Sequence, residues 1–397
     1  MKLKIKGRYF SVALFILFVV YMLFTISDLS ASKQSGFRDV DRSDVHRYLI
    51  LMTSYLFVYA IFNVKKLKLQ QPLTSLVMLA AWTIFVNAIN DASIWLFLVH
   101  SNMAVLWCLS YIFFNRLRSK EVEYKSSIEV FSYLLWLLYA IITVYYFLDM
   151  MIRLGHIPVL NVVYYEMALL PWVLIGNSGK NKKWLYLICM AVAMMSMKRG
   201  AIIAMALMIL ADSYVTAKRI NSYKVFFRIT AIIFVFSVIV AVTDNLSGGF
   251  LSQRFSSEEL ADGSGRADQF SIVWEDIKTR DLFELMLGSG SEKSLQLLGT
   301  GIHNEWLNFL FCYGLIGFLM YVGLIIGFVQ KSISVLKIKS DLAYSCFVMT
   351  ALYLVMSMVS SGYGGYVGFW LFGFWGYLNA ELEMKSNNKI ENNEGKR

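Results

Sequence analysis

Long apolar runs alternate with short polar connectors along nearly the whole chain. Most of the runs approach the roughly 20 residues that a helix needs to cross the hydrocarbon core of a bilayer. They lie at residues 9–26, 48–64, 73–89, 95–114, 129–152, 162–176, 184–197, 201–215, 226–242, 308–329, 342–359 and 366–379. The pattern predicts an all-α polytopic membrane protein with about twelve transmembrane helices.

The run from residue 184 to residue 215 admits two interpretations. As one helix it would place Lys198 and Arg199 near the middle of the bilayer, and as two helices it would turn sharply at Gly200. The positive-inside rule assigns basic connectors to the cytoplasmic side, and only two helices keep all of them there. Both termini are then cytoplasmic. The basic residues of these connectors are Lys65, Lys66, Lys68, Arg116, Arg118, Lys120, Lys180, Lys182, Lys183, Lys218, Arg219, Lys224, Lys331, Lys337 and Lys339.

The longest polar stretch follows the ninth predicted span, which places it outside, in the periplasm of a double-membrane bacterium or its equivalent. The expected organisation is therefore nine transmembrane helices over residues 1–242, a large periplasmic loop over 243–307 and three further transmembrane helices over 308–380. The tail, residues 381–397, is rich in Asn, Lys and Glu and is expected to be disordered and cytoplasmic.

Two short helices are predicted within the loop. The first is amphipathic, with Asp262 or Ser264 as its cap, and it is expected to rest on the membrane surface or on the helix bundle. The second covers residues 282–287 and stops at Gly288-Ser289-Gly290. The apolar positions that define the first helix are Phe270, Val273, Trp274 and Ile277.

Composition narrows the class of protein further. With 58% hydrophobic residues the chain is far outside the soluble range, and the basic connectors account for much of the net charge of +10. A nucleic-acid partner is therefore not implied. All four cysteines fall within apolar runs, which excludes a disulfide framework in the large loop.

Four of the cations predicted on the periplasmic side are candidates for an anion-binding site. Lys198 and Arg199, on the outward turn, are either charges that reach toward water or a site for a phosphate group, which an arginine binds through two parallel hydrogen bonds. Arg254 and Arg266 lie in the loop, where a solvated surface is the simpler interpretation. A lipid-linked phosphate is the ligand that the pair Lys198 and Arg199 would suit.

Four further polar residues are candidates for chemistry. His303 lies where the loop re-enters the bilayer, and it is either a structural hydrogen-bonding residue, a general base or a phosphate ligand. Asn304 and Glu305 follow it as supporting residues, and Glu305 is expected to orient the His303 ring. Glu166 is a carboxylate within the sixth span and is therefore a functional candidate.

A metal site is weakly indicated. Asp39 and Asp41, in the first outer connector, have the spacing of an acidic pair that binds a metal, but such a pair arises readily by chance. The sequence contains no H-E-x-x-H, Walker or G-x-S-x-G motif. The acidic pair therefore remains a weak rival signal for a metal, and no cofactor is expected.

Several short motifs of the C-terminal half together resemble a known family. They are Ser196-Met197-Lys198-Arg199-Gly200-Ala201, Ser264-Gly265-Arg266 with Trp274 downstream, Gly288-Ser289-Gly290, and His303-Asn304 followed by Leu307, Leu310, Gly314 and Gly317. Their order, spacing and position after the ninth span resemble the O-antigen polymerase and ligase superfamily. The resemblance covers roughly residues 190–320.

The resemblance implies an inverting, metal-independent membrane glycosyltransferase with a GT-C-like fold. Its donor would be a glycan on undecaprenyl pyrophosphate at the periplasmic face, and fixed cations would stabilise the departing pyrophosphate. Arg199 and Arg266 would bind that group, with Lys198 and Arg254 in support. His303 would accept the acceptor proton or orient the pyrophosphate.

Polymerase and ligase share this donor and these motifs. A polymerase extends a lipid-linked repeat unit, whereas a ligase transfers the glycan to lipid A-core. We favour the polymerase because polymerases are the more varied members, which is an argument by analogy. Expected partners are the lipid-linked donor and acceptor, membrane lipid, a chain-length regulator and a flippase. The rival from another class is a flippase itself, although the chain shows no clear pair of related halves. A metal-dependent lipid-phosphosugar transferase using Asp39 and Asp41 is the third interpretation.

Overall fold

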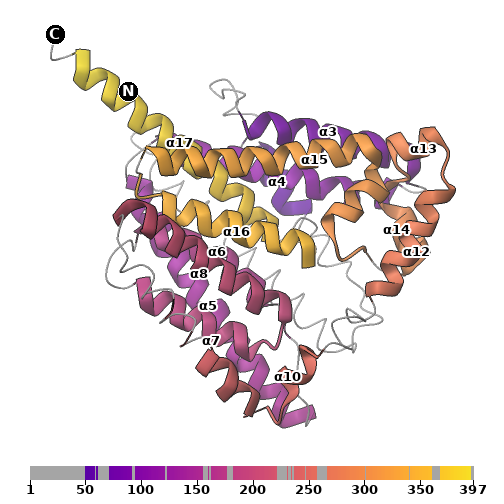
Figure 1. The fold of residues 1–397 in the computed structure, drawn as a ribbon. Helices are drawn as coiled ribbons and strands as arrows, with labels where there is room; N and C mark the ends of the chain where they lie inside the picture. The colour runs from indigo at the N-terminus through magenta and orange to yellow at the C-terminus, as the bar shows by residue number, and fades with distance from the viewer. Residues whose placement is uncertain are drawn as a thin grey trace.

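Every element in the described part of the chain is a helix (Figure 1). The computed structural model describes residues 50–58, 60, 71–91, 94–120, 123–154, 160, 162–176, 182–220, 230, 234, 237–245, 247–256, 266–299, 301–338, 340–359 and 367–394. The helices are α3 (Leu73–Asn90), α4 (Ile94–Lys120), α5 (Glu123–Leu154), α6 (Val163–Gly176), α7 (Lys182–Met195), α8 (Arg199–Ile220), α10 (Phe250–Arg254), α12 (Arg266–Thr279), α13 (Leu282–Leu287), α14 (Gly290–Leu298), α15 (Glu305–Lys337), α16 (Ala343–Val359) and α17 (Val367–Glu394).

The helices follow the predicted apolar runs closely. Five stretches are long and apolar enough to cross a membrane, namely Leu73–Asn90, Ile94–Arg118, Ile128–Asp149, Arg199–Lys218 and Glu305–Lys337. Two shorter apolar helices, Val163–Ile175 and Ala343–Val359, accompany them. The predicted all-α fold is confirmed for the described residues, and the five apolar stretches are consistent with a membrane protein, while the number of spans and the GT-C-like arrangement remain predictions. The predicted span at 9–26 and most of the one at 226–242 lie outside the described residues.

Glycines allow α17 to lie directly against α4. A Cβ atom at Gly376 would overlap the carbonyl group of Tyr111, and one at Gly373 would overlap the ring of Phe114. Small residues at such positions let membrane helices pack backbone to backbone. Around this contact Trp172 of α6 packs edge-on against Trp370 of α17, which completes an aromatic core.

The predicted loop forms a layer of three short helices, α12, α13 and α14, beside one end of α3 and α15 (Figure 1). As predicted, α12 is amphipathic: it buries Val273 and Ile277, although Trp274 is 48% exposed. The second predicted helix is α13, which Asp281 caps by accepting a hydrogen bond from the backbone N–H of Glu284. Helix α14 was not predicted, because its first residue, Gly290, belongs to the glycine pair that we interpreted as a stop.

Two glycines bring the loop layer onto α15. Gly314 interrupts α15 with φ of 65°, and Gly288 ends α13 with φ of 85°. A Cβ atom at either position would overlap the backbone of the other segment. Only glycine meets both demands, the positive φ and the close approach. The break in α15 therefore seats the turn between α13 and α14.

The C-terminal segment differs from the expected disordered tail. Helix α17 continues to Glu394, and Glu381 is buried in an ion pair with Arg118, whose Nε donates to Glu381 Oε2 over 2.6 Å. This pair anchors the segment to α4. Extending a helix that has already formed costs little, and the many Glu and Lys residues that follow are good helix formers.

Candidate functional site

Five helix ends meet at one place in the bundle. They are the N-termini of α6, α8, α12 and α15 and the C-terminus of α16, as the contacts described below establish. The charge pattern of the sequence assigns all five to the periplasmic side. The structure thus brings together ends that the predicted topology places on one face, although the membrane and its two sides remain predictions.

The N-terminus of α8 follows a break in the helix, as the two-helix interpretation requires. Helix α7 ends at Met195, and α8 begins at Arg199. In the turn between them Met197 has φ of 51°, and Ser196 Oγ accepts a hydrogen bond from the backbone N–H of Lys198. The carbonyl of Ser196 also accepts from the N–H of Leu160 at 2.9 Å. The first N–H groups of α8, with the positive end of its dipole, lie beside Lys198 and Arg199.

Arg266 joins the loop to the C-terminus of α16. Its Nη1 donates to the carbonyl of Val359 over 2.7 Å, so the guanidinium caps the negative end of that helix. Val359 also lies against Gly200 of α8, where a Cβ atom would overlap the valine side chain. Arg266 is therefore held next to the N-terminus of α8.

Asn304 ties two helix ends together. Its Oδ1 accepts from the backbone N–H of Leu307 at 2.9 Å, which caps the N-terminus of α15. Its Nδ2 donates to the carbonyl of Met358 over 3.1 Å, near the end of α16. Because both amide atoms are used in this way, Asn304 fixes the position of the neighbouring His303.

The electrostatic effects indicate that three of the four predicted cations lie close together with His303. Burial lowers the pKa of His303, and the charges of Arg266 and Lys198 lower it further. Burial also lowers the pKa of Arg266; Tyr164 acts in the opposite direction, and Arg199 adds to the lowering. Four residues singled out in the sequence thus form one cationic cluster, which we define as Lys198, Arg199, Arg266 and His303. A bound anion would relieve the repulsion within it.

Three other predicted residues lie elsewhere or are only partly described. Glu305, expected to orient the His303 ring, is instead buried in the core and accepts a hydrogen bond from Tyr321 at 2.7 Å. Glu166 is also fully buried, and the thiol of Cys189 on α7 interacts with it. Arg254 ends α10, but its side chain is not among those described.

The predicted acidic pair Asp39 and Asp41 lies outside the described residues. Within the described part, no group of three or more His, Cys, Asp or Glu side chains is arranged to hold a metal ion.

Tyr164 is a residue of the site that sequence reasoning missed. It is the second residue of α6, its side chain is buried, and its hydroxyl contacts the place that a Cβ atom at Gly200 would occupy. Glu166, two residues on, projects about 200° around the helix axis and so faces away from this site. No sequence motif distinguishes Tyr164 from the other tyrosines of the chain, which has 23 in all. Its place in the site depends on a contact with Gly200, which is far away in the sequence.

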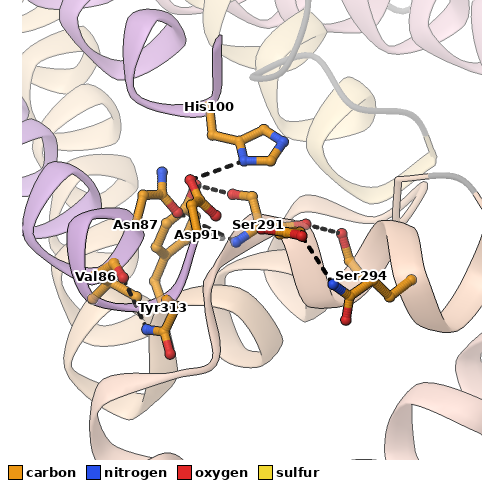
Figure 2. Close-up of polar contacts among 10 residues, drawn as sticks. Val86, Asn87, Asp91, His100, Ser291, Ser294 and Tyr313 are labelled. Atoms are coloured by element: carbon orange, nitrogen blue, oxygen red, sulfur yellow. Dashed lines mark hydrogen bonds and ion pairs between the residues drawn. The ribbon is translucent and has the colours of Figure 1, made fainter. Parts of the chain in front are cut away.

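A second polar cluster, also unpredicted, holds the loop layer on the membrane helices (Figure 2). Asp91, which follows α3, pairs with His100 of α4 through Nδ1 at 3.1 Å, and its side chain is fully buried. Asn87 Oδ1 accepts from the backbone N–H of Ser291 at the start of α14, and Ser291 Oγ lies 2.7 Å from the hydroxyl of Tyr313. This network joins α3, α4, α14 and α15, so we interpret it as structural.

We expect Asp91→Ala to loosen the loop layer without unfolding the bundle. The substitution leaves His100 without its buried partner, which costs about 1–3 kcal/mol locally. Amide hydrogen exchange over residues 266–299 measures the effect, with Glu275→Ala as the control, since the Glu275 side chain is 67% exposed. Unchanged exchange in Asp91→Ala would contradict the anchoring role.

No protein-family model matches this chain, and no curated protein is significantly similar to it.

Proposed function

We propose that this chain is a polysaccharide polymerase of the O-antigen type. It would join oligosaccharide repeat units carried on undecaprenyl pyrophosphate at the periplasmic face of the bacterial inner membrane, by inverting glycosyl transfer. The observation that carries the proposal is the cationic cluster at one end of the helix bundle. The short motifs that resemble the O-antigen polymerase and ligase superfamily, at Lys198, Arg199, Arg266 and His303, supply this same cluster.

The chemistry explains why cations would be needed. An acceptor hydroxyl attacks the anomeric carbon of the donor, and the bond to lipid pyrophosphate breaks. Negative charge grows on the departing pyrophosphate, so positive groups fixed in advance lower the barrier. Arg199 would bind this group with the N-terminus of α8, and Arg266 would contribute the guanidinium nitrogens that do not cap α16.

The electrostatics favour His303 as a ligand rather than a base. A general base becomes positively charged when it takes the acceptor proton, and Arg266 and Lys198 oppose that charge beside His303. A neutral imidazole can still donate a hydrogen bond to a phosphate oxygen. We therefore assign His303 to pyrophosphate binding, in support of Arg199 and Arg266.

The position of the cluster favours an enzyme over the flippase. A transporter is expected to place its substrate site near the middle of the bilayer, between related halves. Here the charged groups gather at helix ends, next to the helices of the soluble loop. A chain-length regulator and a flippase are the partners that a polymerase would require.

The test is the banding pattern of surface lipopolysaccharide in a deletion strain of the native host. Core carrying a single repeat unit is the expected result, because the ligase remains intact when a polymerase is lost. Bare core with polymerised glycan still on the lipid carrier would identify the chain as the ligase. Bare core with single repeats at the cytoplasmic face would identify a flippase and overturn the proposal.

A further inference from the structure

Tyr164 is a buried tyrosine that lies next to the cationic cluster, at the N-terminus of α6. The residue is only 4% exposed, and its hydroxyl has no hydrogen-bond partner among the described residues. A buried hydroxyl without a partner costs about 1–3 kcal/mol, and native proteins contain few of them. A ligand that accepts a hydrogen bond from this hydroxyl would offset that cost, and its binding can be tested.

The hydroxyl lies beside the cationic cluster. It fills the space where a Cβ atom of Gly200 would lie, in the first turn of α8, and it is near enough to Arg266 for the two groups to affect each other's ionisation. The first N–H groups of a helix have no partners within that helix and favour anions. Because Gly200 lacks a side chain, the tyrosine hydroxyl can come close to this helix end.

We propose that the Tyr164 hydroxyl donates a hydrogen bond to a phosphate oxygen of the lipid-linked pyrophosphate, next to the N-terminus of α8. The inference rests on the proposed function and adds to it a neutral donor that no sequence motif marks. In this arrangement Arg199 and Arg266 attract the phosphate by their charge, and the hydrogen bond from Tyr164 orients it. Gly200 is required because any larger residue would displace the hydroxyl.

The test is Tyr164→Phe in the purified, detergent-solubilised protein. Binding of undecaprenyl pyrophosphate should weaken about tenfold, as expected for one hydrogen bond to a charged group. The melting temperature should stay the same or rise, because the substitution removes a buried hydroxyl without a partner. A purely structural tyrosine would instead show a lower melting temperature with unchanged affinity.

Tyr165→Phe is the matched control. Tyr165 is the next residue of the same helix and is also buried, but its ring stacks on Tyr139 with centroids 5.6 Å apart. Its substitution should leave lipid binding unchanged. Gly200→Ala should weaken binding at least as much as Tyr164→Phe, since the added Cβ atom displaces the hydroxyl.

Two further ligands identify the group that the hydroxyl contacts. The affinity for undecaprenyl monophosphate measures how much the second phosphate contributes to binding. The affinity for inorganic pyrophosphate measures how much the lipid contributes. If the wild-type protein binds undecaprenyl pyrophosphate and Tyr164→Phe binds it equally well, the assignment of Tyr164 is overturned while the proposed function stands. If the wild-type protein does not bind this lipid, the proposed function fails, and the assignment fails with it.

Discussion

Arg199→Ala is expected to abolish polymer formation while the protein still accumulates in the membrane. Removing one preorganised group that stabilises developing negative charge costs about 10²–10³ in rate. Arg199 stands at the first position of α8, where its charge adds to that of the helix N-terminus. Its loss therefore removes a cation from the part of the cationic cluster where the helix N-terminus also favours an anion. The distribution of chain lengths in surface polysaccharide from the complemented strain measures the effect.

Arg199→Lys and Lys218→Ala make this test specific. Lysine keeps the charge but not the planar fork that holds a phosphate by two hydrogen bonds, so Arg199→Lys should recover only part of the activity. Lys218 is an exposed cation near the opposite end of the same helix, over the ring of Tyr214, and Lys218→Ala should retain activity. Wild-type chain lengths in Arg199→Ala would show that the arginine is not part of the proposed pyrophosphate site.

The helices of this protein could be predicted largely because a bilayer imposes a simple rule. A segment in hydrocarbon must be both apolar and helical, so apolar runs mark where the helices lie, although α15 and α17 extend well beyond the ends of their runs. The predicted run 162–176 became α6 (Val163–Gly176), and the run 342–359 became α16 (Ala343–Val359). The amphipathic α12 could be predicted for a related reason, since its apolar spacing reflects the face that packs on the bundle.

The misses come from interactions that periodicity does not record. Helix α14 starts at Gly290, where positive φ and a close contact with Asn90 hold the chain, so a glycine that usually signals a stop begins a helix instead. The tail from Glu381 onward is polar enough to suggest disorder, yet Glu381 itself forms an ion pair with Arg118 of α4. Both outcomes depend on partners far away in the sequence.

The candidate site likewise contains residues that the sequence predicts and residues that it does not. The four members of the cationic cluster could be predicted as site residues, because polar and charged side chains at the edges of apolar runs often have a function. The structure brings them together in one cluster. Glu305 was assigned a role from its nearness to His303 in the sequence, but in a helix its side chain points into the core toward Tyr321. Tyr164 and the Asp91–His100 pair give no local signal, since a tyrosine or an aspartate near a helix end is unremarkable until its neighbours are known.

Binding of undecaprenyl pyrophosphate is expected to tighten as pH falls, and His303 is expected to be one cause. Burial and the charges of Arg266 and Lys198 hold the pKa of His303 below its usual value, so the ring is neutral at pH 7. A bound anion adds negative charge beside the ring and raises that pKa. Binding then takes up a proton between the two pKa values, and affinity rises as pH falls through this interval.

The lowered pKa of His303 also determines how the stability of the protein without ligand changes with pH. The folded state binds this proton less readily than the unfolded chain does. The contribution of His303 to stability is therefore complete above the unfolded pKa of about 6.5 and declines as pH falls through that value. The melting temperature should drop less with falling pH in His303→Gln than in the wild-type protein.

The measurement is the dissociation constant of undecaprenyl pyrophosphate between about pH 7.5 and about pH 5.5, in the wild-type protein and in His303→Gln. Uptake of one proton changes affinity by at most about tenfold per pH unit. The lipid pyrophosphate titrates as well, but its own protonation affects both proteins alike, so the difference between their slopes isolates His303. Glutamine keeps a hydrogen-bond donor but cannot take up the proton, and it should flatten the profile. Equal slopes in the two proteins would show that the ring does not face the bound anion.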